Sequence, residues 1–122
     1  MMAHAIRFAD REGLPAAGLQ ARTLIDGGLY DVRRVLAGPG EVHGPARFGG
    51  DACVCVLEGS VRFEVDGSIH DLGPRDVLWV PAGSLRRFVA GDGGVALLAV
   101  HLPASRATGA VLAMAAGARG EA

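Results

Sequence analysis

The stretch from residue 56 to residue 88 reads VLEGSVRFEVDGSIHDLGPRDVLWVPAGSLRRF, and it decides the fold. It contains two glycine-anchored phrases, VLEG at residues 56–59 and PAGSLR at residues 81–86. Between them, residues 61–65 alternate apolar and polar side chains and are followed by Asp-Gly. An Asp-Gly pair accepts the positive φ angles of a two-residue hairpin turn. The stretch therefore predicts antiparallel strands joined by tight turns.

Turn-forming residues recur throughout the rest of the chain. Clusters of Gly, Pro and Asp occupy residues 26–28, 38–40, 49–51, 66–67, 73–74, 81–83 and 91–94. Strand-like runs lie between them, at residues 30–37, 53–57, 61–65, 77–80, 85–90 and 95–102, and the alternating residues 68–72 also read as a strand. Many short strands at even spacing are typical of a β-sandwich or β-barrel. We expect one all-β domain over residues 1–122, with a barrel core from about Tyr30 to Leu102 and a short C-terminal helix capped by Ser105.

The overall composition excludes several kinds of partner. The chain has 122 residues, a formal net charge of −1 and no lysine, so it has no basic surface for nucleic acid or anionic lipid. Charged residues interrupt the N-terminus where a signal peptide needs an apolar run, and no segment approaches the length of a membrane span. We therefore expect a cytoplasmic protein that binds neither nucleic acid nor membrane.

Two runs of the chain are apolar on both faces. They are residues 53–57, which include Cys53 and Cys55, and residues 95–100. No second Cys or His pair lies near the two cysteines, so the sequence predicts reduced thiols rather than a disulfide or metal clip. A single barrel covers only its inner face, so the outer faces of these runs favour a homodimer.

The glycine and proline pattern resembles that of the cupin family, over about residues 30–102. Cupins are double-stranded β-helix, or jelly-roll, barrels, and the resemblance implies the same fold here. With the last glycine of the first cupin motif placed on Gly59, its His-x-His positions fall on His43 and Pro45. The glutamate position falls on Ala52, with Asp51 beside it.

The second cupin motif keeps its backbone residues and loses its metal ligands. Pro81 and Gly83 match the motif, whereas Arg75 replaces its first glycine, Arg86 its histidine and Ala90 its asparagine. A guanidinium has no lone pair to give a cation. We therefore expect a degenerate metal-binding motif and no bound metal or other cofactor, unless unaligned donors such as Glu41, His70 or His101 build a site.

His43 and Arg86 are the candidate catalytic residues. His43 is either an acid or base near the barrel mouth or a loop histidine bonded to a carbonyl. Arg86 faces the barrel by the resemblance, and a charge there is costly unless it is paired. Its partner is either an internal carboxylate, Asp51 or Glu41, or an anionic ligand.

Four further residues are candidates for substrate binding. Phe88 shares the inward face of Arg86, and Asp51 lies beside the motif's glutamate position. Arg47 belongs to the same mouth loop and either helps to grip an acidic group or is solvated. Trp79 either stacks on a planar substrate or packs in the core.

Three functions remain open from the sequence. The first is metal-independent acid/base chemistry on a small carbonyl- or carboxylate-bearing molecule, of the isomerase, cyclase or dehydratase type. The second is a small-ligand-binding cupin or sensor without catalysis. The third is a metal-dependent cupin oxygenase or isomerase with atypical ligands.

Overall fold

The structure is a computed structural model that describes residues 3, 5 and 13–102. The described part consists of antiparallel strands joined by turns, without a helix. The strands are β1 (Leu19–Asp26), β2 (Asp31–Ala37), β3 (Val42–Arg47), β4 (Asp51–Val65), β5 (Ser68–Leu72), β6 (Val77–Val80) and β7 (Leu85–Leu102). The expected helix after Ser105 lies outside the described residues. None of the described residues forms a helix with the length and hydropathy that a membrane crossing requires.

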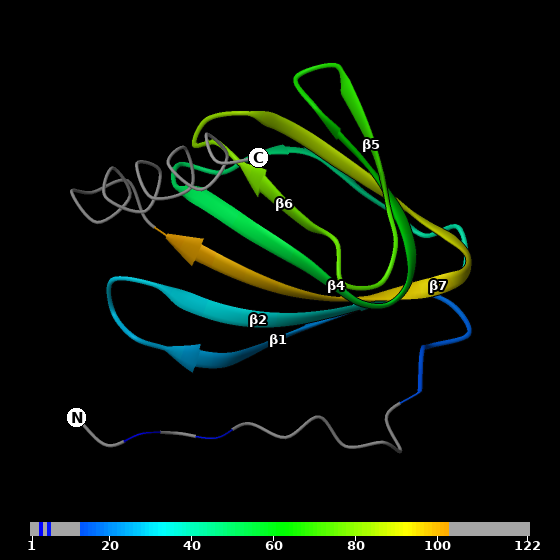
Figure 1. The fold of residues 1–122 in the computed structure, drawn as a ribbon, viewed down its shortest axis with the longest axis horizontal. Helices are drawn as coiled ribbons and strands as arrows, with labels where there is room; N and C mark the ends of the chain where they lie inside the picture. Colours follow the sequence, from blue (N-terminus) through cyan, green and yellow to red (C-terminus); the bar gives the residue numbers. More distant parts are fainter. Residues whose placement is uncertain (1–2, 4, 6–12, 103–122) are drawn as a thin grey trace.

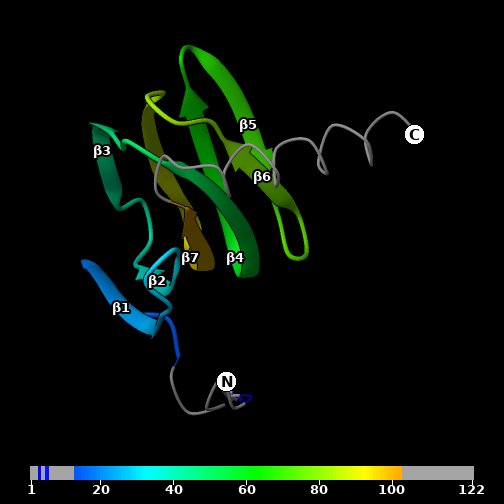
Figure 2. The same ribbon diagram turned by 90° about the vertical axis from the view of Figure 1, so that its left-hand side faces the viewer.

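The strands β4 and β7 run through both layers of a two-layer barrel. Their ends that meet at Asp51 and Leu102 belong to one layer, which β6, β2 and β1 complete. Their other ends, where Val65 pairs with Arg86, belong to the second layer with β3 and β5. Figures 1 and 2 show β4 and β7 curving between the β1–β2 hairpin on one side and β5 and β6 on the other. This arrangement confirms the predicted jelly-roll barrel.

The bend of β4 depends on Gly59. The pairing of β4 with β7 shifts register on both sides of this residue, and its φ is 80°. A Cβ atom at Gly59 would collide with the carbonyl oxygen of Gly94. Only glycine combines this backbone conformation with such a close approach, which is why the VLEG phrase signals the fold.

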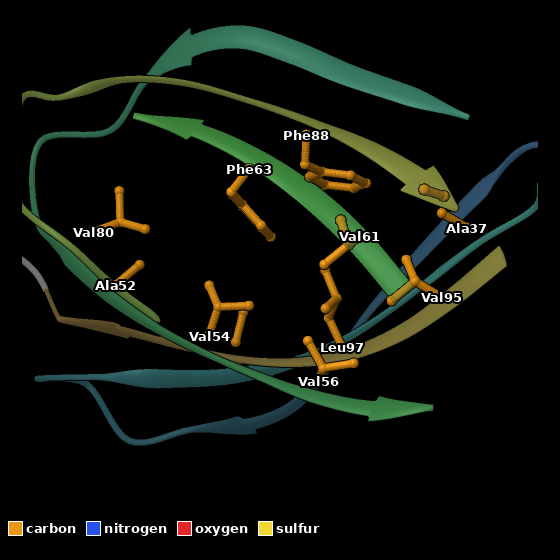
Figure 3. Close-up of a cluster of buried hydrophobic side chains, with 12 residues drawn as sticks. Ala37, Ala52, Val54, Val56, Val61, Phe63, Val80, Phe88, Val95 and Leu97 are labelled. Atoms are coloured by element: carbon orange, nitrogen blue, oxygen red, sulfur yellow. The ribbon is translucent and has the colours of Figure 1, made fainter. Parts of the chain in front are cut away.

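The barrel interior is filled by alternate residues of the long strands. Val54 and Val56 of β4 are buried there, and Leu97 of β7 packs with them. Figure 3 shows these side chains, with Phe63 and Phe88, projecting into the space between the two layers. Because side chains of a strand alternate in direction, the residues between them face outward.

The turn that precedes β6 keeps a glycine-like backbone at Arg75. Residues 73–76 have Pro74 at the second position, a φ of 74° at Arg75, and a 3.0 Å hydrogen bond from Asp76 N to Gly73 O. These are the features of a type II turn, whose third residue is normally glycine. Arg75 therefore adopts a backbone conformation that favours glycine, which is the residue that the resemblance places at this position.

Two strands were not predicted from the sequence. The barrel begins at Leu19 of β1, before the predicted start at Tyr30, and β3 occupies part of the predicted mouth loop. None of the residues of β1, LQARTLID, is fully buried, and Leu19 alone among them packs against the core. In β3, Gly44 and Pro45 weaken the strand pattern, and the only partner of this edge strand is β7 among the described strands.

Candidate functional site

A cavity of about 150 Å³ lies inside the barrel, between the two layers. Its lining comprises eight apolar residues and four polar ones, contributed by β1, β2, β3, β4 and β7. The four polar residues are Arg33, His43, Arg86 and His101. The structure thus brings together His43, Arg86 and Phe88, three of the residues that the sequence singled out.

Two aromatic rings form part of the apolar wall. Phe63 of β4 and Phe88 of β7 are a cross-strand pair, with ring centroids 5.3 Å apart. His43 of β3 pairs with Phe88 on the other side, also at 5.3 Å between centroids. Both phenylalanines are buried, whereas His43 is exposed at the rim of the cavity. The three side chains form one row because paired residues of antiparallel strands share a face.

The guanidinium of Arg86 is half-buried at the cavity and has no acidic partner among the described residues. It forms neither a hydrogen bond nor an ion pair there, and its guanidinium carbon lies over the ring of Phe48, 5.3 Å from the ring centroid. Burial, and secondarily the charge of Arg33, lowers the pKa of Arg86. The expected internal pairing with Asp51 or Glu41 is therefore absent from the described part.

Beside Arg86, His101 and Arg33 share one carboxylate. Asp31 and His101 are opposite each other on β2 and β7, and Asp31 Oδ1 lies 3.2 Å from His101 Nδ1. The same oxygen lies 3.2 Å from Arg33 Nε. The contact between Asp31 and His101 lacks hydrogen-bond geometry, so His101 Nδ1 has no hydrogen-bond partner among the described residues. A nearly buried imidazole, 8% exposed, thus lines the cavity with its Nδ1 facing Asp31.

The environment of His101 favours its neutral form. Burial is the largest effect and lowers the pKa of the imidazole, while Asp31 raises it and Arg86 and Arg33 lower it further. The described charges nearest to His101 are therefore two guanidinium groups and one carboxylate. With His101 neutral, this end of the cavity carries a net positive charge, which favours an anion.

Three predicted binding residues lie elsewhere. Asp51 is buried and accepts a 2.7 Å hydrogen bond from Ala82 N, so it supports the turn after β6 instead of lining the cavity. Arg47 donates a 2.6 Å hydrogen bond to Gly83 O of the same turn. Trp79 pairs with Cys53, which points away from the core, so its ring lies on the outer face of the barrel.

Sequence reasoning missed Asp31 and Arg33, and it left the direction of His101 open. The adjacent arginines at residues 33 and 34 conceal which of them points inward. For His101 a signal existed, because it continues the alternation of Leu97 and Ala99 on one face of β7. The inward direction of Arg33 depends on its pairing with Ala99, which only the assembled sheet defines.

The described residues do not fit the metal that cupins often hold. No three His, Cys, Asp or Glu side chains within the described part converge on a point where a metal ion could bind. At the cavity, His43 and His101 are accompanied by two arginines, which repel a cation. The expectation that the protein binds no metal stays a prediction.

The barrel with an internal cavity defines a small-ligand-binding domain of the cupin type. The sequence model of the AraC-like ligand-binding domain matches residues 29–121, and the chain belongs to this family. No curated protein sequence matches the chain at a significant level.

Solved structures of similar proteins share the fold. A cupin superfamily protein of Desulfitobacterium hafniense is 24% identical, with a TM-score of 0.66 over 70% of this chain and 78% of that chain. A Rhizobium leguminosarum protein of unknown function is 19% identical, with a TM-score of 0.71 over 84% of this chain and 99% of that chain. A Ralstonia eutropha protein provisionally described as a mannose-6-phosphate isomerase is 26% identical, with a TM-score of 0.68 over 84% of this chain and 100% of that chain.

Proposed function

We propose that the barrel binds a small organic anion and that Arg86 provides its main counter-charge. The observation that carries this proposal is a half-buried guanidinium that lines the cavity without an ionic or hydrogen-bonding partner in the described part. A charge removed from water is destabilising until an opposite charge and hydrogen bonds compensate it. A bound carboxylate or phosphate supplies both, because the guanidinium presents a fork of donors to two oxygens.

The neighbours of Arg86 support an anion as well. Arg33 adds a second positive charge, already shared with Asp31, and the imidazole of His101 lines the same cavity. The AraC-like ligand-binding family supports binding as the first function of such a cavity. The described charges therefore favour a ligand-binding domain for a small acidic molecule.

Two variants test this proposal against a panel of acetate, benzoate, pyruvate, inorganic phosphate and mannose 6-phosphate. Isothermal titration calorimetry is expected to show saturable binding of at least one anion, weakened about tenfold or more in Arg86→Gln. The matched control is Arg87→Gln, because Arg87 lies next in the chain and contacts Glu64 at 3.4 Å, outside the cavity. No binding by the wild type, or equal weakening in both variants, would refute the proposal.

A second candidate function is acid/base chemistry on the bound molecule. His43 and His101 both line the cavity with Arg86, so an imidazole could move a proton while the guanidinium stabilises an oxygen anion. This is the chemistry of an isomerase, cyclase or dehydratase, and the description of the Ralstonia eutropha protein is in keeping with it.

Proton exchange distinguishes turnover from binding alone. If the cavity is catalytic, the methyl protons of pyruvate exchange with D₂O faster in the presence of the protein, and NMR records the rate. His43→Ala should abolish this acceleration while leaving the affinity that depends on Arg86. Binding without exchange would assign the protein to the non-catalytic function.

A further inference from the structure

The cavity has two chemically different ends. Phe48 marks the polar end, because its ring contacts Arg86 and also lies 4.9 Å, edge to face, from the ring of His101. The rest of the lining includes the buried side chains of Phe63, Phe88 and Leu97, which offer no hydrogen-bonding group, and only His43 at the rim, against Phe88, adds one. A ligand that occupies both ends must therefore be charged at one end and apolar along its body.

From this division we propose that the ligand is a monocarboxylate with a compact apolar body, of the size of benzoate. The inference rests on the proposed anion-binding function and narrows it to one chemical class. It assigns the carboxylate to Arg86 at the polar end and the body to the space beside Phe63, Phe88 and Leu97.

The volume limits the size of the body. The cavity holds about 150 Å³. An engineered apolar protein cavity of about this volume binds one benzene molecule. One ring, or a branched chain of similar bulk, therefore fills the cavity, whereas a disaccharide or a nucleotide would extend past the exposed side chains of His43 and Arg33 into solvent.

The lining disfavours a polyol. Each hydroxyl group that leaves water needs a hydrogen-bonding partner, and an unpaired buried hydroxyl lowers affinity. Eight of the twelve lining residues are apolar, and the polar ones are Arg33, His43, Arg86 and His101. A sugar of the same size would leave several hydroxyl groups against Val54, Phe63 and Leu97.

The charge at the polar end matches one negative charge. Arg86 has no partner in the described part, whereas Arg33 already contacts Asp31. A carboxylate carries a single charge and two coplanar oxygens, which a guanidinium binds bidentately. A phosphate monoester carries up to about two charges at neutral pH and would leave part of that charge uncompensated.

Calorimetry with four probes tests the inference. Benzoate should bind at least about tenfold more tightly than benzyl alcohol, which keeps the ring and lacks the charge. Its affinity should also be about tenfold higher than that of acetate, which has the charge but lacks the apolar body, because the buried ring adds apolar contact area. Glucose should show no saturable binding.

A variant that fills part of the cavity tests where the apolar body of the ligand binds. Leu97 is buried and lines the cavity where the body is placed, so Leu97→Phe should weaken benzoate binding at least tenfold while acetate affinity changes less than twofold. Circular dichroism and thermal unfolding establish that this variant is folded. If it does not fold, the comparison of the four probes on the wild-type protein and on Arg86→Gln still decides the question.

The outcomes separate the two proposals. If acetate or phosphate binds through Arg86 and benzoate has no advantage, the benzoate-sized class is wrong and the anion-binding function stands. If no anion binds, both are wrong. If glucose or benzyl alcohol binds as tightly as benzoate, the cavity selects against neither hydroxyl groups nor neutral ligands, and the inference is overturned.

Discussion

At the scale of single residues, Arg86 is expected to lower the stability of the folded protein and, by our proposal, to bind the ligand. Its guanidinium is withdrawn from water at a place where the described part of the chain supplies no counter-charge. Functional sites commonly retain such locally unfavourable groups, and replacing them tends to stabilise the protein while removing activity. The ligand-free protein therefore carries a destabilisation at Arg86, which the anion of the proposed function would relieve.

Arg86→Met is expected to raise the free energy of unfolding of the ligand-free protein by about 1 kcal/mol, because methionine fills similar space without a charge. Urea denaturation measures the change. Arg87→Met, which removes the ion pair with Glu64, should not stabilise the protein. A clear loss of stability in Arg86→Met would mean that this arginine has a structural partner.

His101 predicts a dependence of stability on pH. The pKa of His101 in the folded protein lies below its ordinary value of about 6.5, mainly because the ring is buried, although Asp31 opposes the shift. Below that pH the unfolded chain binds a proton that the folded protein resists, so the free energy of unfolding falls as the pH drops from 7 towards the lowered pKa. Denaturation at several pH values measures this slope, and His101→Gln should make it shallower. An unchanged slope in this variant would contradict the prediction.

At the scale of elements, the type II turn at residues 73–76 retains avoidable strain. A non-glycine residue in the left-handed region destabilises the folded state by about 1–2 kcal/mol. Glycine avoids this strain, but its greater freedom in the unfolded chain offsets about 0.5–1 kcal/mol of the gain. The hydrogen bond from the backbone N of residue 75 to Val56 O, 2.8 Å long, does not depend on the side chain. A substitution at this position can therefore remove the backbone strain and leave this hydrogen bond in place.

Arg75→Gly is expected to raise the free energy of unfolding by about 0.5–1 kcal/mol, as measured by urea denaturation. Arg75→Ala is the matched control, since it removes the exposed side chain but keeps the Cβ atom and its strain. Equal effects of the two substitutions would show that the side chain, and not the backbone conformation, is responsible.

The elements also show what a sequence can and cannot predict. The hairpin at Asp66 and Gly67 was predicted because its signal is local: both residues have positive φ angles, 48° and 85°, and the turn joins β4 to β5 directly. The strand β1 and the inward direction of Arg33 were missed because they depend on pairing with residues far along the chain. Asp51 was predicted to bind substrate, but it is buried and accepts a hydrogen bond from Ala82 N, a contact between residues far apart in the chain that the sequence does not reveal.

At the scale of the whole molecule, one outer face of the barrel has an unusual composition. On this face Cys53 lies between Trp79 of β6 and Val100 of β7. Two residues further along β4, Cys55 lies between Val77 and Leu98. Burial raises the pKa of Cys53, with a smaller contribution from Cys55, which is in keeping with an unreactive thiol. Both cysteines are free. An apolar sheet face of this kind is typical of surfaces that become covered.

The homodimer expected from the sequence remains a prediction, and this face is its proposed interface. Val77 is 60% exposed, so Val77→Glu should fold normally and weaken the dimer about tenfold or more by placing a charge in the contact. Light scattering across a concentration series measures the molar mass. The control is Ile69→Glu, because Ile69 on β5 is 58% exposed and belongs to the other layer. A wild-type monomer at micromolar concentration would refute the prediction.

The passage of β4 and β7 through both layers also has a consequence for biosynthesis. Asp51 at the start of β4 pairs with Leu102 at the end of β7, so neither layer is complete until the last strand has left the ribosome. At about 5–20 residues per second, the apolar run of β4 waits several seconds for its partner. During that time β6 can cover one edge of the run, but the edge that β7 will cover stays unpaired and can associate with other nascent chains. Chaperones that hold extended apolar segments would act on this chain at that stage.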